Sequence, residues 1–351
     1  MPTGPLLSII GPTATGKTQL ALDATEWLAD RMNGFDLISV DSRQVYRELA
    51  ITSGADVPAG FERRQGYWQR DRVRLYGVGI ISADQDWSVA QFGRLARRVA
   101  AAAWRRRRLP VLIGGTGLYH RWALGAGAEL NTPPDPQLRR QAAKLRLDEL
   151  QDWLARVDRR RWAAMNRSDR HNARRLIRAI EQARAAGPAR QTGGSLKPQP
   201  HLQLGLERPL DHLAAVICRR VVKRLEAGAQ QEVTSLLARH GLQVLDRPAG
   251  STAGVRDVWA YIQGKLEYDQ LIDRWARREL QYAKRQLSWW RADEAASAGG
   301  RQWFDVTAAH VRTMLKAAVT SLESVHPETG SETDPKTGLE TGSETGPVSR
   351  P

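Results

Sequence analysis

One short segment near the N-terminus carries residues that could hold a phosphate group. The stretch GPTATGKT, Gly11 to Thr18, matches the pattern G-x-x-x-x-G-K-[ST] in full. Such a loop presents backbone N–H groups and the positive end of a helix dipole to an anion, with the lysine as a mobile charge and the threonine as a possible Mg²⁺ ligand. Kinases, ATPases and some transferases use this chemistry, so the loop alone leaves the reaction open.

Two further segments could complete a site. DSRQVY begins at Asp41, directly after an apolar run, and LIGGTGLY places a glycine turn and Thr116 after another. Ligands of an open parallel sheet bind outside the carboxyl ends of its strands, so Asp41 should face the same crevice as the phosphate loop. Asp41 could be a Mg²⁺ ligand, a base, or only a cap of the following turn. Glycines in the third segment would let backbone approach a ligand closely.

The surrounding sequence predicts the elements that hold these segments. Apolar runs predict buried strands at 5–11, 35–42 and 109–115, and a glycine-interrupted strand at 74–81. Helical spacing of apolar residues predicts helices at 17–30 and 88–107. The order strand, phosphate loop, helix, strand is typical of a parallel α/β sheet flanked by helices, similar to that of P-loop NTPases. We therefore expect the first part of an α/β core over residues 1–126.

Residues 127–196 follow a different pattern. They contain no convincing strand and carry 15 Lys and Arg against 8 Asp and Glu, a net charge of +7 out of +15 for the whole chain. We predict an all-helical, basic insertion domain with a polar exit loop at 187–200.

The remaining sequence predicts a return to the core over 197–322. HLQLGLE, 201–207, alternates like a strand, and long helices are expected at 210–240 and 267–291. Residues 323–351 repeat an ETG-like unit with almost no apolar side chains, which is typical of a disordered, low-complexity tail.

Composition narrows the class of protein. With 351 residues of which 41% are hydrophobic, the chain can build a sizeable core. Its single cysteine, Cys218, excludes an intrachain disulfide and a multi-cysteine metal site, which fits a reducing cytoplasm. No long apolar run or signal-like N-terminus is present, so we expect no membrane association, and a monomer is the default. The excess of 53 Lys and Arg over 38 Asp and Glu favours a polyanionic partner.

Together the three segments resemble the tRNA dimethylallyltransferases, also called tRNA isopentenyltransferases. NARRLIRAIE, beginning at Asn172, is similar to the family's N-x-R-R-[IL]-x-R-A-[IL]-E helix. YAKRQ, beginning at Tyr282 and followed by Trp289, Trp290 and Arg291, is similar to the family's Y-A-K-R-Q-x-T-W-[FL]-R. The landmarks occur in family order over roughly residues 5 to 291.

The resemblance implies a reaction and its donor site. The enzyme would transfer a dimethylallyl group from dimethylallyl diphosphate to N6 of the adenine 3′ to the anticodon (position 37), in tRNAs reading codons that begin with U. The phosphate loop would hold the diphosphate rather than ATP, with Mg²⁺ near Thr18. The implied diphosphate-binding residues are Gly11, Thr13, Ala14, Thr15, Gly16, Lys17 and Thr18, and the implied catalytic residues are Asp41 as base together with Thr13, Lys17 and Arg220.

The resemblance also implies an RNA-binding surface on the anticodon stem-loop. Thr13, Ser42, Gln44 and Thr116 would line the adenine side, and the arginines of the insertion would grip the stem. The implied tRNA-binding residues are Asp41, Ser42, Arg43, Gln44, Thr116, Arg174, Arg175, Arg178, Lys284 and Arg285. For the arginine cluster, a solvated helix face remains the alternative, and for Arg220 a surface ion pair.

The chain departs from the family pattern in three places. After the DSRQVY segment the family usually continues G-M-D-I-G-T-A-K-P, whereas this chain reads ELAITSGAD over 48–56. The family's H-H-x-[IL]-D near 75–81 is absent from LYGVGII, and Val222 and Arg224 replace an acidic residue and a methionine. An adenylate-type isopentenyltransferase, a small-molecule kinase and a tRNA-binding homologue without catalysis therefore remain alternatives.

Overall fold

The computed structural model describes residues 3–55, 57–125, 132, 134–185, 196, 200–296 and 301–323. The tail predicted at 323–351 lies outside these residues except for its first member, and so do most of the exit loop predicted at 187–200 and residues 127–131. Those parts of the predictions stay untested. Within the described ranges, no helix is both long and apolar enough to cross a membrane.

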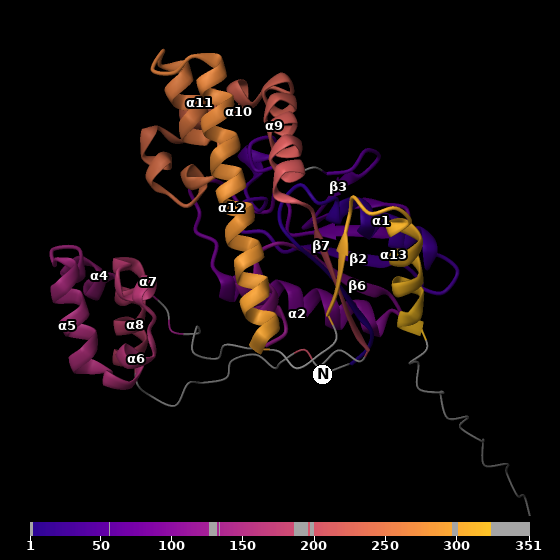
Figure 1. The fold of residues 1–351 in the computed structure, drawn as a ribbon, viewed down its shortest axis with the longest axis horizontal. Coiled ribbons are helices and arrows are strands. Elements are labelled where there is room, and N and C mark those ends of the chain that lie inside the picture. Colours follow the sequence, from indigo (N-terminus) through magenta and orange to yellow (C-terminus); the bar gives the residue numbers. More distant parts are fainter. Residues whose placement is uncertain are drawn as a thin grey trace, which may run out of the picture.

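One eight-stranded sheet forms the centre of an α/β core, in the order β3-β4-β5-β2-β6-β1-β7-β8 (Figure 1). From β5 to β8 the neighbours pair in parallel, whereas β3, β4 and β5 are antiparallel. The strands are β1 (Leu6–Ile10), β2 (Phe35–Ser39), β3 (Glu62–Arg64), β4 (Tyr67–Arg70), β5 (Val73–Tyr76), β6 (Leu109–Gly114), β7 (His201–Glu207) and β8 (Arg301–Asp305).

The predicted α/β sheet is confirmed, and it is mixed rather than wholly parallel. The antiparallel hairpin β3–β4 was not predicted because its residues, ERR and YWQR, are exposed or half-buried at a sheet edge and so lack an apolar run. The strand expected at 74–81 ends at Tyr76, since Gly77 and Gly79 take positive φ values of 83° and 61°.

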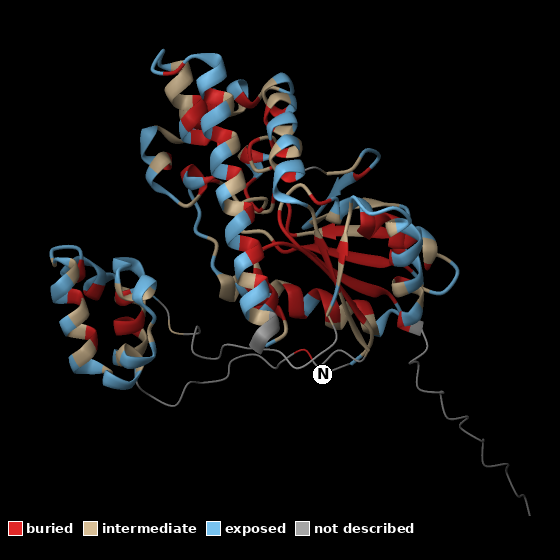
Figure 2. Cartoon of the chain, in the orientation of Figure 1, coloured by how far each residue is buried: buried red, intermediate tan, exposed pale blue. Residues whose placement is uncertain are grey.

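Helices cover both faces of the sheet, which is why the central strands read as continuous apolar runs (Figure 2). Leu7, Ile9 and Leu37 pack on one face with α1 (Lys17–Trp27) and α13 (Val311–Thr320). Leu6 and Ile38, one position along, pack on the other face with α2 (Val89–Arg105) and α3 (Gly117–Ala123). Side chains alternate along a strand, so adjacent residues serve opposite layers.

A second helical layer stands beyond the carboxyl edge of the sheet. It comprises α9 (Leu210–Glu226), α10 (Ala229–His240), α11 (Val255–Ile262) and α12 (Tyr268–Ala296). The helical stretch predicted at 210–240 is confirmed, and it forms two helices because Gly228 adopts a left-handed φ of 101° between α9 and α10. Trp275 and Leu271 of α12 pack in one core with Tyr46 and Leu49, so this layer is tied to the segment after β2.

The described part of the predicted insertion is helical and has a small core of its own. Side-chain oxygens of Asp135, Asp158, Asn166 and Asn172 cap helix starts here. Leu138, Leu150, Leu154, Leu176 and Ile180 form the apolar interior. We call residues 134–185 the helical module; its helices are α4 (Pro136–Ala142), α5 (Leu147–Val157), α6 (Arg159–Ala164), α7 (Arg167–Arg170) and α8 (Ala173–Arg184).

Candidate active site

The phosphate-loop sequence connects β1 to α1. Gly11 has a φ of 133°, and a Cβ there would lie 2.1 Å from the carbonyl oxygen of Leu206, so only glycine fits beside β7. Ala14 and Gly16 also take positive φ values, 64° and 84°, and the buried Thr15 hydroxyl donates to the Pro12 carbonyl at 2.9 Å. The loop is thus held in a compact turn at the carboxyl end of a central strand.

Lys17, at the start of α1, lies in an environment that weakens its charge. Burial and, to a smaller extent, the guanidinium of Arg220 lower the pKa of its ammonium group to about 7, against the raising effect of the Asp41 carboxylate. Its Nζ donates to the Pro12 carbonyl oxygen. A polyanion in the loop would raise this pKa again by charge pairing, so the site favours a negatively charged ligand.

Asp41 follows β2 and both caps a turn and faces the loop. Its Oδ1 accepts from the backbone N–H groups of Arg43, at 2.7 Å, and Gln44, at 3.3 Å. Burial raises the pKa of the carboxyl group, against the lowering effect of these two bonds. Because both bonds end on Oδ1, the second carboxylate oxygen is the one available to a ligand. The turn-cap interpretation and the base interpretation are therefore compatible.

The third segment, LIGGTGLY, is held against α12. Gln286 accepts from the backbone N–H of Thr13 at 3.0 Å, Trp290 donates to the carbonyl of Gly115 at 3.2 Å, and the hydroxyls of Tyr282 and Thr116 are 3.2 Å apart. Motifs that are far apart in the sequence therefore meet here.

Glycines make this close packing possible. A Cβ at Gly115 would lie 2.3 Å from Nε2 of Gln286, and one at Gly117 would lie 1.8 Å from the ring of Trp289. The glycines of the turn are thus required by the approach of α12. The YAKRQ motif predicted the resemblance, but sequence reasoning assigned no contact to Gln286 or Trp290.

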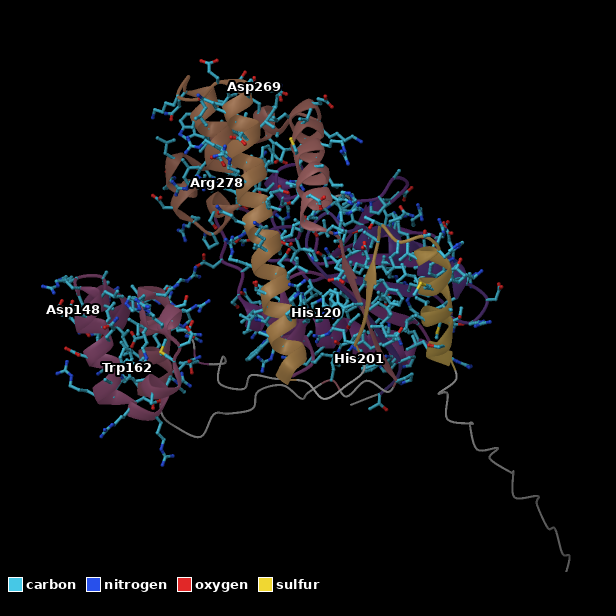
Figure 3. All side chains as sticks on the ribbon, viewed as in Figure 1. His120, Asp148, Trp162, His201, Asp269 and Arg278 are labelled. Atoms are coloured by element: carbon cyan, nitrogen blue, oxygen red, sulfur yellow. The ribbon has the colours of Figure 1, made fainter. Side chains whose placement is uncertain are left out.

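Two histidines were also missed, the buried His120 and the half-buried His201 (Figure 3). His120 lies 3.2 Å from the carbonyl oxygen of Gly114, and its ring meets Trp290 edge-on. Burial lowers the pKa of His120 to about 3 and that of His201 to about 4, so both are neutral at physiological pH. His120 contacts the turn through the Gly114 carbonyl, whereas His201, at the start of β7, lies 2.9 Å from the Ser8 hydroxyl oxygen. A lone histidine in sequence carried no signal for either contact.

Two cavities meet at the loop and at Asp41. The first, of about 400 Å³, contains the phosphate loop, and we call it the loop cavity. The second, of about 510 Å³, opens toward α11 and α12, and we call it the helix cavity. Residues that line both are Thr13, Asp41, Gln44, Gly54 and Arg220. A ligand in one cavity could therefore react with a ligand in the other at Asp41.

Arg220, from α9, reaches this junction. Its Nη1 donates to the Thr13 hydroxyl at 3.1 Å, and its side chain is half-buried. Ser42, Arg43 and Arg285 line the helix cavity, where the adenine side was expected. The Thr116 hydroxyl lies 3.2 Å from the hydroxyl of Tyr282, and Tyr282 lines the helix cavity. Lys284 is exposed on α12.

The segment that departs from the family pattern is well anchored. Glu232 accepts from the backbone N–H groups of Ile51, at 2.7 Å, and Thr52, at 2.8 Å. Arg224 is buried and paired with Glu279. A Cβ at Gly54 would lie 2.0 Å from Nη2 of Arg224, so the glycine and the arginine require each other.

The three arginines predicted to bind tRNA lie on α8 but differ in surroundings. Arg174 is exposed, and Arg175 is paired with Asp169. Arg178 pairs at 2.8 Å with Glu181, which also takes an ion pair from Arg139 at 2.7 Å. Burial raises the pKa of Glu181, but the bonds from the two arginines outweigh it and lower the pKa. Arg178 therefore stabilises the interior of the module by pairing with the buried Glu181.

The site has few protein ligands for a metal ion. Among the described residues there is no group of three His, Cys, Asp or Glu side chains that could hold one. Thr18 is exposed and lines the loop cavity, with Asp41 in the same lining. This set suits Mg²⁺ only if the ion also takes oxygens from a bound phosphate group and water.

Comparison with known proteins gives consistent similarities. A model of the IPP transferase family matches residues 44–293. A tRNA dimethylallyltransferase of Synechococcus sp. (strain JA-2-3B'a(2-13)) is 35% identical over 289 residues, which cover 82% of this chain and 76% of that protein. One of Moorella thermoacetica is 35% identical over 300 residues, covering 82% and 87%.

Solved structures resemble the fold. A tRNA isopentenylpyrophosphate transferase of Bacillus halodurans matches with a TM-score of 0.62 at 28% identity, covering 92% of this chain and 98% of that one. A eukaryotic dimethylallyltransferase acting on tRNA matches with a TM-score of 0.69 over 89% and 78% of the two chains. At 20% identity, this second likeness supports the fold alone.

Proposed function

Because the chain belongs to the IPP transferase family, we propose that it transfers a dimethylallyl group from dimethylallyl diphosphate to N6 of the adenine 3′ to the anticodon, position 37 of tRNA. Its relatives are named tRNA dimethylallyltransferases, and tRNA dimethylallyl transfer is the activity of this enzyme. The tRNAs concerned are those reading codons that begin with U. The observation that carries the proposal is the junction of two cavities at Thr13, Asp41 and Arg220.

In the proposed reaction the loop cavity binds the donor. The bond between C1 of the prenyl group and the diphosphate oxygen breaks, and the diphosphate leaves with the electron pair. Backbone N–H groups between Gly11 and Thr18, the Lys17 ammonium and the Arg220 guanidinium stabilise the negative charge as it develops. We assign the Thr13 hydroxyl, which accepts from Arg220 at 3.1 Å, to a contact with the leaving oxygen.

The helix cavity receives the acceptor. The adenine N6 lone pair is delocalised into the ring, so a base must take a proton from N6 as the bond to C1 forms. We assign this role to the second carboxylate oxygen of Asp41. Burial raises the pKa of Asp41 and so makes it a stronger base than an ordinary aspartate. Ser42, Gln44 and Thr116 would orient the adenine ring.

We propose Mg²⁺ as the cofactor, held by the Thr18 hydroxyl and by diphosphate oxygens. Bound there, the ion would supply positive charge to the leaving diphosphate. Among the described residues no cluster of three His, Cys, Asp or Glu side chains could hold the ion by itself, which agrees with coordination largely by the substrate.

The acceptor adenine must leave its stack to enter a cavity, which requires a separate grip on the RNA. We propose that the helical module and α12 supply that grip on the anticodon stem-loop. The net charge of +7 over 127–196 supports this, as does the exposure of Arg174, Arg175, Lys284 and Arg285. Because one chain supplies every residue at the cavity junction, we propose a monomer. We also propose a cytoplasmic location, which fits the single cysteine of the chain.

Mass spectrometry of product tests the proposal. Unmodified tRNA with adenine at position 37 is incubated with the protein, Mg²⁺ and dimethylallyl diphosphate, beside free AMP as acceptor. We expect a gain of C5H8 on one loop adenine of the tRNA and none on AMP. A gain on AMP would favour an adenylate-type transferase. No gain on either, with salt-sensitive tRNA binding retained, would favour a binding protein without catalysis.

A further inference from the structure

Part of the lining of the loop cavity is apolar. Leu75, Val78, Ile113 and Val216 line it there. In the proposed function the diphosphate occupies the loop, so the hydrocarbon tail of the donor must lie against these side chains. The length of tail that fits depends on where this apolar side ends.

The apolar side ends at a second space rather than at a closed wall. Ala55, Val78 and Arg220 line both the loop cavity and a further cavity of about 570 Å³, which we call the annex. Ala55 is one of the smallest side chains available, and only Val78 shares the apolar part of this boundary. The annex lies between α9, the segment after β2 and the hairpin β3–β4.

The apolar surface continues across the boundary. Val57 and Trp68, which line the annex, pack in the same hydrophobic cluster as Leu75 and Ile113 of the loop cavity. Ala55 and Val78 belong to this cluster and join the two ends. An alkyl chain leaving the loop cavity would therefore stay in contact with apolar side chains.

The cations around the annex are largely engaged in holding its walls. Arg63 stacks on the Trp68 ring and donates to the Gly79 carbonyl at 2.8 Å. Arg47 donates to the Ile80 carbonyl at 2.8 Å, and Arg224 pairs with Glu279. Lys223 is exposed at the rim. The interior of the annex therefore suits an alkyl group better than a second anion.

The sequence departure after Tyr46 agrees with this geometry. The lysine of the pattern G-M-D-I-G-T-A-K-P falls at Ala55 in this chain. A lysine at this buried position would place an ammonium group between the two cavities, and burying it would disfavour an apolar tail there. With alanine this position adds no charge to the passage, and the charged residue that lines both cavities is Arg220, which donates to the Thr13 hydroxyl.

We propose that this enzyme accepts prenyl diphosphates longer than five carbons, with the second isoprene unit bound in the annex against Trp68. The inference rests on the proposed function, since it needs the diphosphate in the phosphate loop. The bond changes are the same for both donors. The N6–C1 bond forms, the C1–oxygen bond breaks, diphosphate leaves with the electron pair, and the N6 proton passes to Asp41.

Two donors in one assay test the proposal. Geranyl diphosphate and dimethylallyl diphosphate are each supplied to the full-length protein with Mg²⁺ and unmodified tRNA, and the loop adenine is analysed by mass spectrometry. We expect gains of both C10H16 and C5H8, with kcat/KM values within about tenfold of each other. A gain of C5H8 alone at saturating geranyl diphosphate would overturn the proposal. No gain from either donor would instead contradict the proposed function on which it rests.

Filling the annex locates the tail. Ala50 and Ala227 are exposed and line the annex but not the loop cavity, so Ala50→Trp and Ala227→Trp should fold and fill it. Both variants should lower geranyl transfer at least tenfold and leave dimethylallyl transfer unchanged. Ala215→Trp, at an exposed site on α9 outside both linings, is the matched control and should change neither. Geranyl transfer that survives both filling variants would show that the tail lies elsewhere.

Discussion

The carboxyl edge of the sheet and the helical module use charged residues in opposite ways. At the sheet edge, Lys17 and Asp41 lie in a desolvated environment that moves both pKa values toward neutrality. On the module, Arg174 is exposed and Arg175 retains much of its exposure beside Asp169. The first arrangement suits the proposed proton transfer, and the second presents permanent charge.

The difference agrees with the functions proposed for the two regions, group transfer at the sheet edge and RNA binding on the module. Bond breaking needs fixed dipoles and charges in a site with little water, where they act strongly. A grip on a phosphate backbone needs arginines that water can reach, because release of counterions drives that binding. Figure 2 shows the matching burial, with buried central strands in the α/β core and a small interior in the module.

Replacing Asp41, the proposed base, should have the largest effect. It should slow the reaction at the carboxyl edge of the sheet and leave RNA binding by the module unchanged. Asp41→Asn keeps the turn-capping oxygen but cannot accept the N6 proton, so kcat should fall by about 10²–10⁴. Affinity for tRNA, measured by filter binding, should change little because the module is untouched. Equal losses of kcat and of tRNA affinity would contradict the assignment of Asp41 as base.

Opening the core of the module should have the next largest effect. Leu154 is fully buried there, and Leu154→Ala should cost about 2–5 kcal/mol of stability, a large share for so small a unit. We expect protease cleavage within 134–185 and loss of tRNA affinity, while inorganic diphosphate still binds. Val157→Ala on the same helix is the control, since Val157 is 40% exposed. A matching loss of diphosphate binding in Leu154→Ala would mean that the two regions are not independent.

The pH dependence of activity should report the titration of Lys17 and Asp41 and not that of residues in the module. Lys17 must be protonated to attract diphosphate, and its pKa of about 7 means that kcat/KM for the donor should fall as pH rises above 7, up to tenfold per unit. The raised pKa of Asp41 should give a loss on the acid side. Lys17→Arg keeps its charge and should move the basic limb to higher pH. An unmoved limb would mean that another group titrates.

Single arginines of the module should give the smallest effects and should differ from each other. Arg174→Gln should weaken tRNA binding a few-fold, lower the slope of log affinity against log salt by about one, and leave stability unchanged. Arg178→Gln removes one partner of the buried Glu181, so it should lower the free energy of unfolding by about 1–3 kcal/mol. Equal stability for the two variants, measured by thermal melting, would remove the distinction.

Much of the sheet and of the site was predictable because the signals are local. Apolar runs predicted β1, β2 and β6, alternation predicted β7, and the phosphate-loop spacing predicted a turn before α1. The edge hairpin and β8 were missed because strands there are short and partly polar. The break at Gly228 was missed because an isolated glycine in a helical pattern does not by itself indicate a left-handed φ.

The contacts that assemble the site were out of reach of sequence reasoning. Thr13 and Gln286 are 273 positions apart, and Gly115 and Trp290 are 175 apart. Even Arg224 and Glu279, which explain the glycine at 54, come from different helices. Such pairs depend on how whole helices pack, which the periodicity of one segment does not encode.

Residue types and their spacing along the chain therefore establish the phosphate loop, the acid after β2, the glycine turn and the basic character of 127–196. These features are set by short-range backbone geometry and by charge, which need no distant partner. Packing decides the rest: the raised pKa of Asp41, the lowered pKa of Lys17, the meeting of two cavities at Thr13, and the position of Ala55 between the loop cavity and the annex. Both pKa shifts depend on the exclusion of water, which results from the packing of α9 and α12 over the carboxyl edge of the sheet.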